Sequence, residues 1–197
     1  MRYSKWFLIN FIVLIILLTG CLGKPSLELI SSSAEIRDDR SGGIGIMSGE
    51  RKGEFIYPIS LSYDFVLKNS GSRILGRAKK PNKATFGFED GIKVSIEPKG
   101  KLLAIVKEVI GCNIFEEEDR RQNHVGIGTM GTPVLAPGVE SKFTFDFVLG
   151  AAEENPEIRL VPSKEQLDKL ERNAMEATLV IHIEDKEIAR FDLAQLN

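Results

Sequence analysis

Hydrophobic and polar residues alternate along several segments of the chain, and strict alternation predicts half-buried β-strands. One such segment covers residues 59–67, and turn residues follow it at 68–71. A second segment covers residues 143–149 and comes after a Pro137-Gly138 turn. The alternating hydrophobic residues are Ile59, Leu61, Tyr63, Phe65 and Leu67 in the first segment and Phe143, Phe145, Phe147 and Leu149 in the second. We therefore predict two strands that each bury one face.

Two hairpins follow from the requirement that the hydrophobic side chains of paired strands share the buried face. A two-residue Asp-Gly loop after Phe88 would place the phenylalanines of 86–88 on the face opposite the aliphatic residues of 92–96. A three-residue loop instead pairs Phe88 with Ile92 and brings both sets to one face, so we favour it. At the C-terminus, a three-residue loop over 185–187 does the same for residues 179–183 and 189–193, and it pairs His182 with Arg190.

Two other segments have the spacing of amphipathic helices. Hydrophobic residues recur at helical intervals from Leu102 to Ile110, and Gly111 stands where a helix would end. The hydrophobic run 102–106 also fits a buried strand, although we favour the helix. Residues Ser163 to Gln166 form a capping box, after which Leu167, Leu170 and Ala174 mark a buried stripe. The charged run 116–121 predicts a solvated loop.

Strands in succession, joined by turns and accompanied by two helices, predict a mainly β protein with an antiparallel sandwich. The segment YDFVLKNSG, residues 63–71, resembles strands of bacterial immunoglobulin-like domains. This resemblance implies an immunoglobulin-like β-sandwich with two short accessory helices.

The first residues have the three parts of an export signal. Arg2 and Lys5 supply positive charge, Trp6 to Leu18 are almost entirely hydrophobic, and small residues precede Cys21. The motif Leu18-Thr19-Gly20-Cys21 resembles the lipobox of bacterial lipoproteins. The resemblance implies cleavage before Cys21, a diacylglycerol on its thiol and often acylation of the new amino terminus. The alternative is an uncleaved membrane anchor over Trp6 to Gly23, at the short limit of a bilayer span.

These features divide the chain into a signal peptide at 1–20, a lipidated tether at 21–53 and a β-sandwich domain at 54–197. The tether is rich in glycine and polar residues, and we expect at most one short strand in it, Leu27 to Ile30. The lipobox resemblance implies a lipid-anchored protein on the extracytoplasmic side of a bacterial cell. Leu22 after the cysteine implies the outer membrane in a two-membrane bacterium and the outer leaflet in a one-membrane bacterium.

Charge excludes nucleic acid as an expected partner. Without residues 1–20, the chain has 24 basic and 28 acidic residues and a formal charge of −4, whereas nucleic-acid binding needs a clustered basic excess. One local basic cluster consists of Arg73, Arg77, Lys79, Lys80 and Lys83. We interpret it as a solvated loop, with binding of anionic lipid head groups or cell-wall polyanions as the alternative.

No motif predicts a catalytic site, a metal or a cofactor. Cys112 has no intrachain partner once Cys21 is lipidated, so we expect it to be buried as a small hydrophobic residue. Residues 126–131, GIGTMG, match a dinucleotide-binding pattern, but no helix begins after them, so we interpret them as a loop or an edge strand. In residues 71–78, Arg77 and Ala78 replace the lysine and the hydroxyl that a phosphate loop needs.

We therefore expect a binding or structural module at the cell envelope, with the membrane and another envelope protein or a wall polyanion as partners. The alternative is an extracytoplasmic enzyme whose active site the sequence does not reveal. A deep pocket with a titratable pair would favour the enzyme, and an apolar patch on a flat surface or an edge strand would favour binding.

Overall fold

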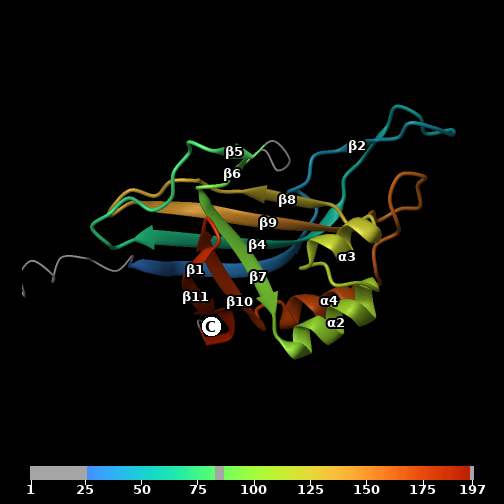
Figure 1. The fold of residues 1–197 in the computed structure, drawn as a ribbon. Coiled ribbons are helices and arrows are strands. Elements are labelled where there is room, and N and C mark those ends of the chain that lie inside the picture. The colour runs from blue at the N-terminus through green and yellow to red at the C-terminus, as the bar shows by residue number, and fades with distance from the viewer. Residues whose placement is uncertain (1–25, 83–86, 196–197) are drawn as a thin grey trace, which may run out of the picture.

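Two antiparallel β-sheets form the body of the protein (Figure 1). The structure is a computed structural model that describes residues 26–82 and 87–195. The four-stranded sheet has the order β1-β4-β9-β8, with bounds Leu27–Arg37, Ile59–Asn69, Glu140–Gly150 and Ile127–Met130. The three-stranded sheet has the order β11-β10-β7, with bounds Lys186–Asp192, Ala177–Ile183 and Ile92–Pro98.

Three α-helices and two short ribbons accompany these sheets in the described part of the chain. The helices are α2 Gly100–Ile110, α3 Glu117–Gln122 and α4 Lys164–Asn173, and a 3₁₀ turn, η1, covers Leu193–Gln195. One ribbon pairs β2 Ile44–Gly45 with β3 Phe55–Ile56, and the other pairs β5 Pro81–Asn82 with β6 Gly87–Phe88. The predicted mainly β, antiparallel architecture is confirmed, with one helix more than expected.

One hydrophobic core joins the two sheets to α2 and α4. Its buried side chains come from β4 and β9 of the four-stranded sheet and from β7 and β10 of the three-stranded sheet. The strands predicted at 59–67 and 143–149 are confirmed as parts of β4 and β9, and the alternating residues of β4 point into this core. The hydroxyl of the buried Tyr63 donates a hydrogen bond of 2.9 Å to the carbonyl of Ala174, which ties β4 to the end of α4.

Both predicted helices are confirmed, and each ends or begins as its sequence indicates. Gly111 follows α2 with a φ of 87°, a left-handed conformation that glycine adopts at little cost. The capping box of α4 is present, because Gln166 N–H donates to Ser163 Oγ and Ser163 N–H donates to Gln166 Oε1. Among the residues that the structure describes, no helix is long and hydrophobic enough to span a bilayer.

The prediction of a hairpin between Phe88 and Ile92 is wrong. Strand β6 pairs with β5, so that Phe88 lies opposite Pro81, and β7 pairs with β10 over seven positions. The pairing of β7 with β10 is more favourable than a hairpin with β6, because it brings Ile96 beside Leu179 in the core. Phe86 lies outside the described residues.

The prediction of a solvated loop at 116–121 is also wrong, because α3 occupies residues 117–122. Acidic residues fill its first turn and arginines its last turn, which is the favourable arrangement for a helix dipole. In addition, Asp119 accepts a hydrogen bond of 2.7 Å from the backbone N–H of Asn113 and so fixes the start of this segment.

The C-terminal hairpin forms, but its loop has two residues, Glu184 and Asp185, instead of three. His182 therefore lies opposite Glu187 instead of Arg190, and a register irregularity between Ile181 and His182 places Ile181 opposite Ala189. The hydrophobic residues still share one face, because the register of Ile181 moves by two residues and a two-residue shift preserves the face.

The longest departure from expectation lies in the segment predicted as a tether. Residues 27–37 form β1, which pairs with β4 along its length, where only a short strand at 27–30 was expected. A β-bulge between Leu29 and Ser31 changes which residues face the core, from Leu27 and Leu29 to Ala34 and Ile36. This change breaks the period of two and hides the strand from the sequence pattern.

Candidate functional site

The most exposed hydrophobic surface lies on the β2–β3 ribbon, which we call the arm and define as residues 43–57. The arm projects from one end of the four-stranded sheet, at the upper right of Figure 1. Its strands pair Ile44 with Ile56 and Gly45 with Phe55. Beyond this pairing, the N–H of Ile46 donates a hydrogen bond to the carbonyl of Glu54, and the N–H of Gly53 donates one to the carbonyl of Ile46, each at 2.9 Å. These hydrogen bonds give the arm a defined pair of faces.

One face of the arm is packed against the segment that follows β9. Ile46 is 2% exposed and joins Ile56 and Ala151 in a small second core, with Ile158 beside it. Two polar contacts reinforce this packing. Arg51 forms an ion pair of 2.9 Å with Glu153, and Met47 N–H donates a hydrogen bond of 2.9 Å to Glu157 Oε1. The arm is therefore held in place against the body of the protein.

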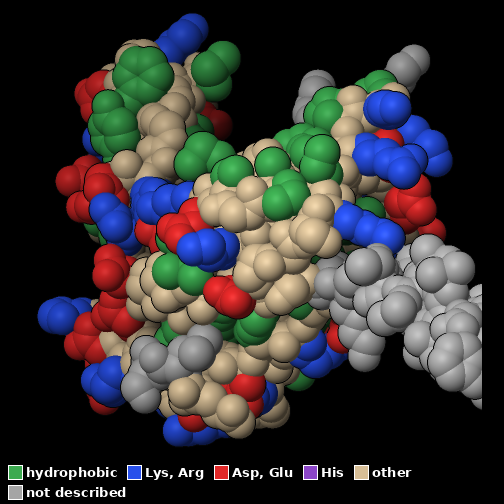
Figure 2. Space-filling model, turned by 90° about the vertical axis from the view of Figure 1, so that its left-hand side faces the viewer, with side chains coloured by type: hydrophobic (Ala, Val, Ile, Leu, Met, Phe, Trp, Pro, Cys, Tyr) green, Lys and Arg blue, Asp and Glu red, His purple; other side chains and the backbone are tan. Residues whose placement is uncertain are grey.

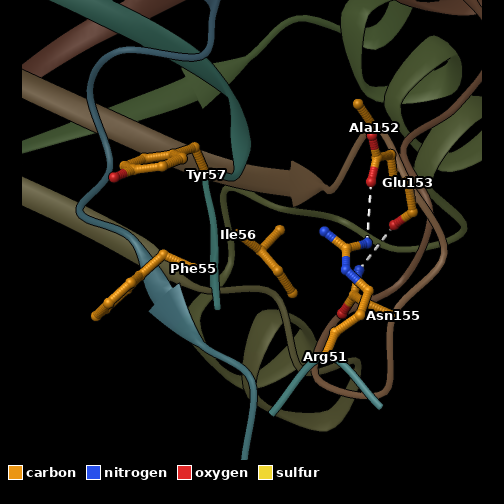
Figure 3. A pocket seen from close by; sticks show the side chains of 7 residues that line it. All are labelled: Arg51, Phe55, Ile56, Tyr57, Ala152, Glu153 and Asn155. Carbon is orange, nitrogen blue, oxygen red and sulfur yellow. Dashed lines mark hydrogen bonds and ion pairs between the residues drawn. The ribbon is translucent and has the colours of Figure 1, made fainter. Parts of the chain in front are cut away.

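The other face of the arm carries three large hydrophobic side chains in water: Met47, Phe55 and Tyr57, which are 73%, 63% and 62% exposed. Figure 3 shows that Phe55 and Tyr57 point to one side of their strand while Ile56 points to the other, toward Ala152. Figure 2 shows hydrophobic side chains gathered at the top of the tall projection on its left, which is the arm.

Gly43 has no side chain to separate the two aromatic rings from the backbone of the arm. A Cβ atom added to Gly43 would lie 3.0 Å from Phe55 Cδ1 and 3.3 Å from Tyr57 Cε1, so both rings lie close to the bare backbone. An exposed face with neighbouring large hydrophobic residues is typical of an interaction site. We call Met47, Phe55 and Tyr57 the arm face.

A shallow hollow of about 220 Å³ lies between the arm and the segment after β9 (Figure 3). It is smaller than the roughly 300–1,000 Å³ of a typical small-molecule site. Arg51 and Glu153 supply its charged side chains, and they are paired with each other. The hollow therefore fits a side chain of a partner better than a small substrate.

The basic residues predicted as a possible anion site lie in the segment after β4, which we call the basic loop and define as residues 70–80. Arg73, Arg77, Lys79 and Lys80 are all exposed there, and Lys83 lies outside the described residues. The loop is anchored to the body because Leu75 and Leu135 exchange two backbone hydrogen bonds, of 3.0 and 2.9 Å. The structure therefore places four of the five predicted residues on one exposed loop. Cys21 lies outside the described residues.

Asp90 fixes the end of the basic loop. It is buried, and its carboxylate accepts backbone hydrogen bonds from Lys79 and Lys80, of 3.3 and 3.1 Å. Burial opposes ionisation of Asp90, but the N–H groups of Lys80 and Lys79 hold the pKa of this carboxyl below its ordinary value. Asp90 thus stays charged and keeps the two lysine side chains on the surface.

The outer face of the four-stranded sheet carries a partly buried polar cluster that contains two carboxylates. Asp64 pairs with both Arg40 and Lys142, while Asp146 lies opposite Ser62 in the strand register. Within the described part of the chain, Arg40 Nε, Ser62 Oγ, Asp64 Oδ1 and Asp146 Oδ1 are buried without a hydrogen-bond partner. The pairing with Arg40 holds the segment that leads from β1 into the arm against the sheet.

The remaining candidates have structural roles. Cys112 is 3% exposed, as expected, and burial raises the pKa of its thiol, which lowers its reactivity. The GIGTMG segment contains the edge strand β8, as one of its two interpretations predicts. No group of three or more metal-ligating His, Cys, Asp or Glu side chains occurs among residues 26–82 and 87–195.

The arm face was missed by the sequence reasoning, which placed residues 43–53 in a tether. The available signal was the run of three hydrophobic residues, Phe55 to Tyr57, which follows the alternating Ile44 and Ile46. Comparisons with family models, with curated proteins and with solved structures find no match to this chain.

Proposed function

We propose that the protein is an exported bacterial lipoprotein, anchored by a lipid on Cys21, whose domain binds another envelope protein through the arm face. The observation that carries the binding role is the exposure of Met47, Phe55 and Tyr57 on a ribbon whose opposite face is firmly packed. The lipid anchor is supported by the Leu18-Thr19-Gly20-Cys21 motif. It would place the domain on the extracytoplasmic side of the membrane.

The domain that presents the arm is immunoglobulin-like in this proposal. If the seven long strands, β1, β4, β7, β8, β9, β10 and β11, are lettered A to G in chain order, the sheets read A-B-E-D and G-F-C. That is the strand order of constant-type immunoglobulin domains. The arm then belongs to the A–B connection, and the basic loop belongs to the B–C connection at the opposite end. Such sandwiches expose their connections to partners on a rigid frame.

The arm face is large enough to contribute most of a binding energy. Full burial of one large hydrophobic side chain contributes about 1.5–3 kcal/mol, and a few such residues dominate protein interfaces. Because the arm is already ordered by the Ile46 core and the Arg51–Glu153 pair, binding requires little further ordering of the backbone. An ordered, exposed apolar surface of this kind suits a protein partner with a complementary hydrophobic face.

Site-specific photocrosslinking on intact cells tests this proposal. A photoreactive phenylalanine analogue is placed at Phe55, at Tyr57 and, as a control, at Met130, which is exposed to the same extent on the edge strand β8. We expect an adduct of one defined mass from the two arm positions and none from Met130. The same pattern from all three positions, or no adduct from the arm, would contradict the proposal.

A substitution at Phe55 tests how much this side chain contributes to the binding free energy. Phe55→Ser should weaken partner binding by about 30-fold and lower the yield of the adduct formed from position 57, because truncating an interface hot spot costs about 2 kcal/mol. Lys52→Ser, an exposed change elsewhere on the arm, should leave that yield unchanged.

A further inference from the structure

We propose that the basic loop lies on the surface of the membrane that anchors the chain and binds its anionic lipid head groups, while the arm points away from the membrane. This inference rests on the lipid at Cys21 in the proposed function. It assigns one end of the domain to the membrane and the other end to the protein partner.

The chain enters the domain beside the basic loop. Ser26 O accepts hydrogen bonds from Ser70 N–H at 3.0 Å and from Gly71 N–H at 3.2 Å, and the Ser26 and Ser70 hydroxyls lie 2.9 Å apart. The domain thus begins beside the first residues of the basic loop. Five residue steps separate Cys21 from Ser26, and an extended chain spans at most about 3.6 Å per step, or roughly 18 Å. A lipid on Cys21 therefore keeps this end of the domain close to the bilayer.

The basic loop carries a cluster of positive side chains. Arg73, Arg77, Lys79 and Lys80 are exposed on the loop, and Figure 2 shows lysine and arginine side chains gathered on the projection at its right. Basic side chains close to an anionic leaflet are attracted to it within a Debye length, about 10 Å at 0.1 M salt.

Several acidic residues lie near the basic loop. The buried carboxylate of Asp90 is occupied by backbone N–H groups of the loop itself. Glu89 is exposed, and Glu184 from the β10–β11 turn lies 3.9 Å from Lys80 Nζ. Asp185, in the same turn as Glu184, is also exposed, so the carboxylates near the loop reduce its positive charge.

The basic loop also contains an exposed hydrophobic residue. Ile74 is 63% exposed, although the next residue, Leu75, is buried. A hydrophobic side chain between cationic ones suits the boundary between head groups and acyl chains, where surface-binding segments combine both features. Ile74 is therefore the residue that should enter the lipid.

The geometry of β4 separates the two ends. Tyr57 lies two residues before the start of β4 and Ser70 follows its end. Ten residue steps along the strand at about 3.4 Å span roughly 34 Å. In Figure 1, the arm and the basic loop extend from opposite ends of the four-stranded sheet. The arm face would stand beyond the reach of the bilayer and accessible to a partner.

Tryptophan quenching by brominated lipids tests this orientation. The chain contains one tryptophan, Trp6, which belongs to the expected signal peptide, so a single reporter can be placed in the processed protein. Membrane-extracted Ile74→Trp and Phe55→Trp proteins are each reconstituted into phosphatidylcholine vesicles with and without phosphatidylglycerol, all with brominated acyl chains. Flotation first shows whether each protein is bound to vesicles.

We expect Ile74→Trp to lose most of its fluorescence in the anionic vesicles and Phe55→Trp to lose none. Combining Ile74→Trp with Arg77→Gln, Lys79→Gln and Lys80→Gln, or raising the salt to 1 M, should restore the fluorescence while the protein still floats. Floating protein without quenching of Ile74→Trp, or with equal quenching of both reporters, overturns the orientation alone. Protein that does not float contradicts the lipid anchor, and both proposals then fail.

Discussion

Replacement of Gly76 by alanine should destabilise the protein far more than the same replacement at Gly138. Both glycines have left-handed backbones, with φ values of 71° and 74°. They differ in their surroundings. A Cβ atom on Gly76 would lie 2.1 Å from the carbonyl oxygen of Pro133, whereas no atom lies within 4 Å of a Cβ on Gly138. The pair therefore separates the cost of backbone conformation from the cost of steric overlap.

The magnitudes follow from these two terms. A left-handed conformation costs a non-glycine residue about 1–2 kcal/mol, and this cost applies to both variants. Overpacking adds about 1–3 kcal/mol, and the overlap at Gly76 is with backbone, which cannot rotate away. Gly138→Ala should lower the free energy of unfolding by about 1–2 kcal/mol and Gly76→Ala by about 2–5 kcal/mol. For a chain of this length, 1 kcal/mol corresponds to about 2–4 °C in Tm.

Urea denaturation followed by circular dichroism measures both free energies on the same protein. Gly76→Ala should be the less stable variant by more than about 1 kcal/mol, the lower end of the overpacking range of about 1–3 kcal/mol. Equal losses for the two variants would refute the close contact between the basic loop and Pro133.

Further predictions concern Tyr63, Cys112 and Asp90. Tyr63→Phe should lower the free energy of unfolding in urea by about 1–2 kcal/mol, because the Ala174 carbonyl loses its donor, whereas Tyr57→Phe on the exposed arm should change it by less than about 0.5 kcal/mol. Cys112 should react with a thiol reagent at pH 8 much more slowly in the folded than in the unfolded protein, since burial raises its pKa, and equal rates would rule out that burial. Asp90→Asn should destabilise the protein at pH 7. Because the folded-state pKa of Asp90 is lowered, its contribution is complete above about pH 4 and is lost at lower pH, so acid unfolding curves of variant and wild type should converge there.

Segments with an uninterrupted period could be predicted from the sequence. Strand β4 buries Leu61, Tyr63, Phe65 and Leu67 on one face, and α4 begins at the capping box of Ser163. In both cases the local pattern and the tertiary packing favour the same structure, so no distant residue has to be known.

Segments that depend on distant pairing could not be predicted. Strand β1 contains a bulge after Leu29 that reverses its alternation, and Ser31 to Ser33 lack hydrophobic character. Strand β7 pairs with β10, more than eighty residues away, in preference to the nearby β6. Local turn chemistry at Gly91 indicates a hairpin, but the core decides which strand β7 joins.

The same distinction applies to the candidate site: the basic loop could be predicted from the sequence and the arm face could not. The basic loop was visible as a charge cluster, because its residues are neighbours in sequence. The arm face needed knowledge that Ile46 and Ile56 pack on Ala151, about a hundred residues later. Without that contact, the exposure of Phe55 and Tyr57 could not be inferred.

Both proposals depend on the lipid at Cys21, and a mass spectrum of the amino-terminal peptide of membrane-extracted protein tests it most directly. We expect the processed chain to begin at Cys21 and to carry the added mass of a diacylglyceryl group. An intact Met1 with an unmodified Cys21 would contradict the account.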